Sequence, residues 1–125
     1  MGMTYGLGPA GYDVRIDETM GLKPGEAKLA STMERFDIPN DVMGMVVDKS
    51  TWARRFVAAQ NTVIEPGWRG HLTLELSNHG VEEIFFERGM PIVQIVFYLL
   101  DEPTTIPYNG KYQDQRIGAV AAILE

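Results

Sequence analysis

Segment 72–78 has the most regular pattern of hydrophobic and polar positions in the chain, because its leucines alternate with polar residues. A period of two predicts a half-buried β-strand, with Leu72, Leu74 and Leu76 facing a core. Glu75 then lies on the opposite face in mid-strand, although glutamate is depleted in strands. A carboxylate on a rigid strand is a candidate for proton transfer, and a solvated outer face is the competing interpretation.

The other apolar stretches are short, and turn-forming Pro, Gly, Asn and Asp residues separate them. Segment 50–56 is the best helical candidate, with Ser50 at the N-cap position. The remaining stretches predict strands at residues 12–16, 27–31, 34–38, 42–47, 62–64, 84–87 and 91–100. Many short strands with one short helix predict an all-β architecture: a sandwich, a jelly roll or a distorted barrel.

Length and composition fit one domain of this class. The chain has 125 residues, of which 45% are hydrophobic, and its 13 Gly and 7 Pro residues imply many turns. We therefore expect a single domain over residues 1–125. No apolar stretch is long enough to span a membrane and no signal peptide is recognisable, so a cytoplasmic protein is expected. The lack of Cys excludes disulfides and thiolate metal sites.

The net charge of −6 argues against binding to a nucleic acid polymer, which requires a basic surface. A small anionic ligand is compatible with this charge, since several cations lie close together in the sequence. These cations are Lys49, Arg54 and Arg55, and then Lys111 and Arg116. They indicate either a phosphate site or a scatter of solubilising charges.

Three familiar kinds of site are not supported. Residues 6–11 match the dinucleotide-binding pattern G-x-G-x-x-G, but too few residues precede them to form the strand that this motif requires. Zinc chemistry needs clustered His and Cys ligands, whereas the chain has only His71 and His79 and no Cys. A serine hydrolase is unsupported because no G-x-S-x-G motif occurs.

Two other segments are candidates for binding an anion. Residues 49–54 place two hydroxyls and two cations where a strand passes into a helix, and backbone N–H groups at a helix start attract phosphate. An N-cap with a solvated arginine is the alternative. Residues 107–116 are polar and aromatic, which fits either a flap that closes over a ligand or a frayed end.

Together these segments resemble the motifs of the dCTP deaminase family, whose superfamily also contains the trimeric dUTPases. The resemblance extends from about residue 11 to residue 120. Lys49-Ser-Thr-Trp-Ala-Arg54 is similar to the family's motif R-S-S-L-A-R. Residues 63–70 and 74–78 are similar to its signature I-D-P-G-W-x-G…L-E-x-x-N, and residues 89–94 are similar to P-G-M-x-I-x-Q. Residues 107–108 and 111–115 are similar to the tail that covers the triphosphate in that family.

The resemblance implies a jelly-roll-like distorted β-barrel that assembles as a homotrimer, with active sites at the subunit interfaces. It implies zinc-independent hydrolytic deamination of dCTP to dUTP and ammonia. The deoxynucleoside triphosphate would bind with Mg²⁺ held mainly by its own phosphates, and the protein would contribute no metal site. The C-terminal tail, about residues 106–125, would close over the nucleotide.

By position, the resemblance implies three catalytic residues. Glu75 would be the general acid and base, Ser50 would position the attacking water, and Arg54 would lie near the reacting centre. Ordinary dUTPases carry an apolar residue in place of Glu75, so Glu75 favours deamination. The residues implied in substrate binding are Lys49, Thr51, Lys111 and Gln115 at the phosphates, Tyr108 and Trp68 at the nucleoside, and Glu65, Gln60 and Asn61 near the sugar and base.

Two sites depart from the family pattern. Glu65 stands where the family has Asp, and Gln60 with Asn61 stand where it has Thr-Ala. In dUTPases the corresponding aspartate activates water, so Glu65 keeps a second reaction open. The alternatives are a dUTPase or bifunctional deaminase–pyrophosphatase giving dUMP and pyrophosphate, and a non-catalytic nucleotide-binding regulator. The departures leave dCTP, dUTP and a modified pyrimidine open as the substrate.

Overall fold

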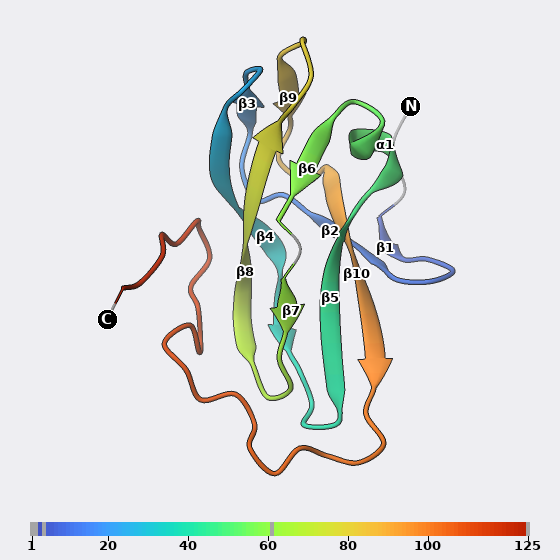
Figure 1. The fold of residues 1–125 in the computed structure, drawn as a ribbon, viewed down its shortest axis with the longest axis vertical. Helices are drawn as coiled ribbons and strands as arrows, with labels where there is room; N and C mark the ends of the chain where they lie inside the picture. The colour runs from blue at the N-terminus through green and yellow to red at the C-terminus, as the bar shows by residue number, and fades with distance from the viewer. Residues whose placement is uncertain (1–2, 4, 61, 125) are drawn as a thin grey trace.

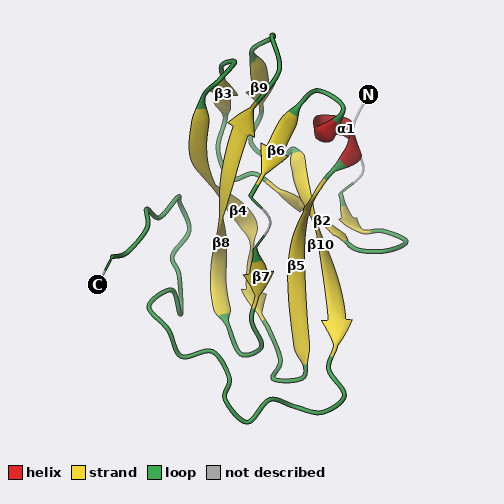
Figure 2. Ribbon diagram, in the orientation of Figure 1, coloured by secondary structure: helices red, strands yellow, loops and turns green. Residues whose placement is uncertain are grey.

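Ten short strands and one short helix make up the regular structure of the described chain (Figure 1). The computed structural model describes residues 3, 5–60 and 62–124. The elements are β1 (Gly6–Leu7), β2 (Tyr12–Arg15), β3 (Met20–Leu22), β4 (Ala27–Asp37), β5 (Val42–Asp48), α1 (Ser50–Ala53), β6 (Val57–Ala59), β7 (Val63–Ile64), β8 (Arg69–Asn78), β9 (Ile84–Phe86) and β10 (Pro91–Leu99). Strands and loops dominate Figure 2. The prediction of an all-β fold with one short helix is confirmed.

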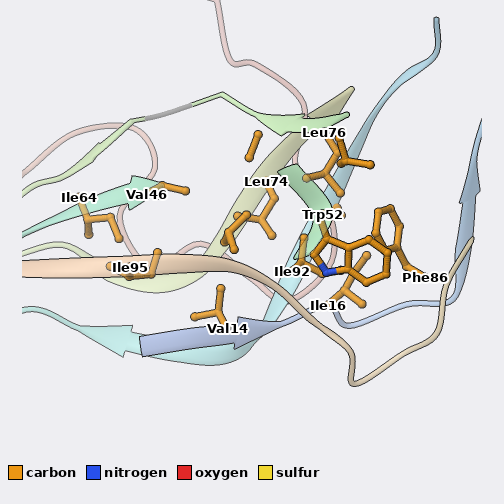
Figure 3. Packing of buried hydrophobic residues seen from close by; sticks show 14 of the residues in the cluster. Val14, Ile16, Val46, Trp52, Ile64, Leu74, Leu76, Phe86, Ile92 and Ile95 are labelled. Carbon is orange, nitrogen blue, oxygen red and sulfur yellow. The ribbon is translucent and has the colours of Figure 1, made fainter. Parts of the chain in front are cut away.

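The strands form two larger sheets that share an apolar core. One sheet has the strand order β1-β2-β10-β5-β7 and the other has the order β4-β8-β6, while β3 and β9 pair separately. The pairings between these strands are antiparallel. Val14 and Ile95 from the first sheet and Leu74 from the second belong to one buried cluster (Figure 3). Two antiparallel sheets packed in this way are typical of jelly-roll-like folds.

Strand β8 lies in the middle of the three-stranded sheet, between β4 and β6. Leu74 and Leu76 are each 1% exposed and belong to the core, whereas Glu75 between them is half-buried on the other side of the strand. The predicted alternation is therefore confirmed for Leu74 and Leu76, whereas Leu72 is only partly buried against the core and also lines the cavity described below. A slip of β8 by one residue would move both leucines out of the core, so the packing fixes the register.

The strands predicted at 27–31 and 34–38 form one strand, β4, which is longer than expected. Its pairing with β8 shifts register midway, so a bulge lies where the sequence pattern indicated a break. The hydroxyl of the buried Thr32 stabilises this bulge. It donates to the backbone oxygen of Glu34 at 2.8 Å and accepts from the backbone N–H of Leu72 at 3.0 Å.

The helix predicted at 50–56 is shorter in the structure, because α1 contains only four residues. Lys49 occupies the N-cap position without a side-chain cap, so the N-cap prediction for Ser50 is wrong: Ser50 is already the first helical residue. Phe56 has a φ of 64°, and this left-handed conformation interrupts the helical backbone. Among the described residues, no helix is long and apolar enough to cross a membrane.

Burial of Trp52 attaches α1 to the core. Its ring meets that of Phe86 edge-on, with 4.8 Å between the centroids (Figure 3). Its indole N–H donates to the backbone oxygen of Pro91 at 2.7 Å. A helix of one turn has little stability of its own, so these contacts stabilise α1, which has no side-chain cap at its N-terminus.

We predict that the adjacent residues Phe86 and Phe85 respond very differently to truncation. Phe86 is fully buried against Trp52, whereas Phe85 is 65% exposed. Phe86→Ala is expected to lower the free energy of unfolding by about 3–5 kcal/mol, and Phe85→Ala by less than about 1 kcal/mol. Urea denaturation at one fixed protein concentration measures both losses. Equal losses would contradict this placement of the core.

Candidate active site

A cavity of about 360 Å³ lies beside β8. Its walls come from β8, from β7 with the turn that follows it, and from the C-terminal segment. Apolar and aromatic side chains predominate in the lining, as in most small-molecule sites. Five residues that the sequence predicted for the site line this cavity together: Glu65, Trp68, Glu75, Tyr108 and Gln115.

Glu75 is the carboxylate that β8 carries to this cavity. Burial raises the pKa of its carboxyl above the ordinary value, while a hydrogen bond to its own backbone acts in the opposite direction. Its backbone is held on both sides, by pairing with Leu29 of β4 and by a 2.9 Å hydrogen bond from the N–H of Gln60 to its carbonyl. Glu75 also borders a smaller depression of about 160 Å³, together with Gln60 and Lys28. Asn61 lies outside the described residues.

The turn between β7 and β8 carries Trp68 and Glu65 to the cavity. The backbone N–H of Trp68 donates to the carbonyl of Glu65 at 3.1 Å. Gly67 has a φ of 88°, and a Cβ there would lie 2.7 Å from that of Pro107, so the turn requires glycine. Trp68 is buried, and its indole N–H donates to the carbonyl of Tyr112 at 2.8 Å. The turn therefore also anchors the C-terminal segment.

The C-terminal segment brings Tyr108 and Gln115 to the cavity. The Tyr108 hydroxyl accepts a hydrogen bond from the backbone N–H of Tyr112 at 3.0 Å. The Gln115 side-chain nitrogen Nε2 donates to the carbonyl of His71 at 2.8 Å and to Oγ1 of Thr73 at 3.0 Å. Because these bonds use both amide hydrogens, donation from Gln115 to a phosphate would require one of them to break.

The residues predicted from segment 49–54 lie apart from this cavity. Figure 1 shows α1 beyond β6, whereas the C-terminal segment runs along the opposite side of β8. Ser50, Thr51 and Arg54 are exposed, and none of them lines the cavity. A single chain therefore does not bring Ser50 and Arg54 together with Glu75.

Two lysines predicted at the phosphates form bonds within the protein. Lys49 Nζ donates to a carboxylate oxygen of Asp13 at 2.6 Å, and the two side chains are only 14% and 13% exposed. Lys111 Nζ donates to the carbonyl of Ile123 at 2.5 Å and lies 5.6 Å from the ring centroid of Tyr112. Neither lysine lines the cavity.

Other lining residues were not predicted as site residues from the sequence, among them Thr73, Tyr112, Val120 and Ala122. Thr73 could have been found, because a period of two places it on the same face of β8 as Glu75. Val120 and Ala122 reach the cavity only because the C-terminal segment docks beside β8. That segment has no periodic pattern from which its docking could be inferred.

The arrangement is suited to proton transfer on a bound heterocycle. A carboxyl with a raised pKa is more readily protonated than an ordinary one, so it can both accept and return a proton, and aromatic side chains beside it can pack on a flat ring. Glu65 adds a second carboxylate to the same cavity. Among the described residues, no group of three or more His, Asp or Glu side chains is placed to hold a metal ion.

We predict that Glu75→Gln stabilises the folded protein more at high pH than at low pH. Because folding raises the pKa of Glu75, folding takes up a proton between the unfolded and folded pKa values, and the free energy of unfolding falls as the pH rises. Glutamine avoids the cost of burying the charge. The gain in melting temperature over wild type should therefore grow as the pH rises above the ordinary pKa of a glutamate, about 4.3. Glu102→Gln, at an exposed position, is the control, and a pH-independent gain would contradict the burial of Glu75.

A family model of dCTP deaminase-like proteins matches residues 12–100 of this chain. A dCTP deaminase of Thermococcus gammatolerans is 38% identical, over 88% of this chain and 80% of that protein. A dUMP-forming dCTP deaminase of Beutenbergia cavernae is 39% identical, over 83% of this chain and 58% of that protein. A dUTPase of phage phi11 of S. aureus, whose structure holds a structural Mg(II) ion, superimposes with a TM-score of 0.69 at 17% identity, covering 90% of this chain and 91% of that one. The resemblance of the motifs is thereby confirmed, and the chain belongs to the dCTP deaminase-like family.

Proposed function

We propose that this protein is a zinc-independent dCTP deaminase, which hydrolyses dCTP to dUTP and ammonia in the pyrimidine deoxynucleotide metabolism of the cytoplasm. The observation that carries the proposal is Glu75, a carboxyl with a raised pKa that β8 holds at a largely apolar cavity. The relatives named dCTP deaminase, at 34–38% identity, support the same activity.

The reaction needs one group that both accepts and returns protons. Water adds to C4 of the cytosine ring while N3 gains a proton, and the 4-amino group then leaves as ammonia. Glu75 would take a proton from the water and deliver it to N3. It would then move the remaining hydroxyl proton to the departing amine, which leaves the C4 carbonyl of uracil. A carboxyl whose pKa is raised towards neutrality can perform both transfers.

We assign the nucleoside part of the substrate to the cavity. Tyr108 would pack on the nucleotide, and Trp68 would form part of the sugar pocket wall with Glu65 at the sugar. These three side chains line the cavity, which supports their assignment. Gln60 and Asn61 would lie near the base, and Gln60 borders the depression next to the cavity.

We propose that a second subunit completes the site. None of the described residues that line the cavity is Lys or Arg, although a triphosphate carries several negative charges. The exposed Ser50 and Arg54 of a neighbouring subunit in a homotrimer would position the water and contact the base. Lys49 and Thr51 from the same segment would contact the phosphates. Such sharing accounts for the distance of α1 from the cavity of its own chain.

The C-terminal tail, about residues 106–125 of a single domain spanning residues 1–125, would close over the nucleotide. Its docking beside β8 supports this role. Lys111 and Gln115 would exchange their bonds within the protein for bonds to phosphate. Mg²⁺ would be held mainly by the phosphate oxygens of the nucleotide and by water, and it would neutralise part of the phosphate charge.

A second candidate is a bifunctional enzyme that also cleaves the triphosphate to give dUMP and pyrophosphate. Glu65 favours it, because this carboxylate lines the same cavity as Glu75 and could activate a second water. A relative at 39% identity is named as dUMP-forming. Glu65 is one methylene longer than the aspartate of the family pattern, so its reach towards the phosphates decides between the two activities.

We predict that the purified protein with Mg²⁺ converts dCTP to dUTP and ammonia, and that Glu75→Gln lowers this rate by at least ~10²-fold because it removes the proton carrier. Nucleotide binding should survive the change. Chromatography of the products distinguishes the candidates: dUMP and pyrophosphate support the bifunctional enzyme, and binding without turnover of any deoxynucleotide supports a non-catalytic regulator. Wild-type turnover by Glu75→Gln would refute the role of Glu75.

We predict that two inactive variants complement each other when mixed. Glu75→Gln subunits retain Arg54, and Arg54→Ala subunits retain Glu75. If each site combines one subunit's Glu75 with its neighbour's Arg54, trimers reassembled from equal amounts should recover about a quarter of wild-type activity. The assay compares the reassembled mixture with each variant treated alone. A mixture no more active than the single variants would show that the two residues act within one chain or not at all.

A further inference from the structure

We propose that Thr73 is a positioning residue that ties the C-terminal segment to the strand carrying Glu75 and so completes the wall of the cavity. Thr73 lies two residues before Glu75 on β8, and both line the cavity. The importance of Thr73 for catalysis rests on the proposed function of Glu75. The contacts of Thr73 do not depend on that function. The proposed chemistry needs a carboxyl that is shielded from water. Thr73 would contribute to this shielding indirectly, because it holds the segment that covers the cavity.

The Thr73 hydroxyl holds two points of the segment at once. Its oxygen accepts from Nε2 of Gln115 at 3.0 Å and from the backbone N–H of Val120 at 3.2 Å. A hydroxyl oxygen has two lone pairs, so these donors use its full accepting capacity. The Thr73 side chain therefore binds both ends of loop 115–120.

The neighbouring strand β4 supplies a second anchor for the same loop. Ser31 pairs opposite Thr73, and its buried hydroxyl accepts from the backbone N–H of Gly118 at 3.0 Å. Gly118 has a φ of 98°, which favours glycine at the tip of the loop. Ser31 and Thr73 together bind the middle and both ends of loop 115–120.

The start of β8 is shaped to receive the segment. The backbone N–H of His71 donates to the carbonyl of Gln115 at 2.9 Å, which adds to the bond from the Gln115 side chain to His71. Gly70 has a φ of 141°, and a Cβ at this position would lie 2.6 Å from the backbone nitrogen of Gln115. A side chain at residue 70 would displace the segment, so the close approach requires glycine there.

At and just beyond the end of the loop, Val120 and Ala122 contribute apolar side chains to the cavity wall. Val120 is partly buried and Ala122 is exposed, and in our proposal these two apolar side chains limit the access of water to Glu75, whose carboxyl has a pKa raised by burial. The other ionisable side chains at the cavity and the adjoining depression are Glu65, Tyr108, Tyr112 and Lys28. None of these ionisable groups lies in the wall formed by Val120 and Ala122. Release of this wall would therefore change the pKa of Glu75 by admitting water and not by moving a charge.

Trypsin cleavage after Arg116 tests the anchoring directly, because Arg116 is exposed and lies within the anchored loop. Thr73→Val keeps the shape of the side chain and removes the acceptor, whereas Thr73→Ser keeps the hydroxyl. Release of fragment 117–125, followed by mass spectrometry, should be about tenfold faster in Thr73→Val than in wild type and nearly unchanged in Thr73→Ser. Gln115→Leu removes the donor of the hydrogen bond to Thr73 and should have the same effect as Thr73→Val. If Thr73→Val does not fold, Gln115→Leu serves as the test variant in its place.

Carbon-13 NMR titration of the Glu75 carboxyl tests the effect on the site without any substrate. The pKa of Glu75 should be lower in Thr73→Val than in wild type and restored in Thr73→Ser. Thr104→Val is the matched control, because it removes a hydroxyl that accepts from the backbone N–H of Ile106 elsewhere in the C-terminal segment. It should change neither cleavage after Arg116 nor the pKa of Glu75.

Two results would overturn the role of Thr73: unchanged cleavage in Thr73→Val, or faster cleavage with an unchanged pKa of Glu75. Neither readout uses turnover, so both remain decisive if the protein does not deaminate dCTP. If it does, the acidic limb of the kcat profile should move to lower pH in Thr73→Val and stay in place in Thr73→Ser. A kcat profile that does not move would likewise overturn the link between the wall and Glu75.

Discussion

The inward burial of Leu74 and Leu76 is the constraint on which the site depends. Burying a leucine side chain stabilises a protein by roughly 1.5–3 kcal/mol, and both side chains are almost fully buried. Because side chains alternate along a strand, these two residues leave Glu75 only one direction in which to point. The core therefore positions the carboxylate, and β4 and β6 on either side of β8 prevent the strand from shifting.

Rigidity of the carboxylate and control of its surroundings come from different parts of the chain. The backbone of Glu75 belongs to a central strand, whereas a segment without regular structure walls much of the cavity. That segment is attached by individual hydrogen bonds, from Gln115, Gly118 and Val120 to the hydroxyls of two β-strand residues. Individual hydrogen bonds of this kind can break while the sheets stay folded, which is compatible with the proposed closing of the segment over a nucleotide. In our proposal, the pKa of Glu75 then depends on whether the segment is docked.

The fold was largely predictable from the sequence, because its strands follow hydrophobic alternation and Gly or Pro residues mark its turns. The errors arose where tertiary contacts override local preference. Burial of Trp52 stabilises a helix of only one turn, whereas the local sequence predicted a helix that extends to residue 56. The Thr32 hydroxyl stabilises a bulge within one strand, whereas the local sequence predicted two separate strands there.

The site was predictable only in part. Alternation indicates that Glu75 leaves the core, and the motif resemblance adds the residues of the turn, which the structure brings to the same cavity. Spacing along the chain could not show that Ser50 and Arg54 lie away from that cavity, because this depends on how the two sheets are arranged. Nor could it show that Val120 and Ala122 reach the cavity, because their placement follows from hydrogen bonds to β4 and β8 rather than from any pattern of their own.

A crystal structure of the protein with Mg²⁺ and a non-reacting dCTP analogue tests the central claim most directly. The account predicts that the pyrimidine occupies the cavity with N3 and C4 within hydrogen-bonding reach of the Glu75 carboxyl, and that Arg54 of a neighbouring subunit approaches the same ring. A base bound elsewhere, with Glu75 hydrated and facing bulk solvent, would contradict it.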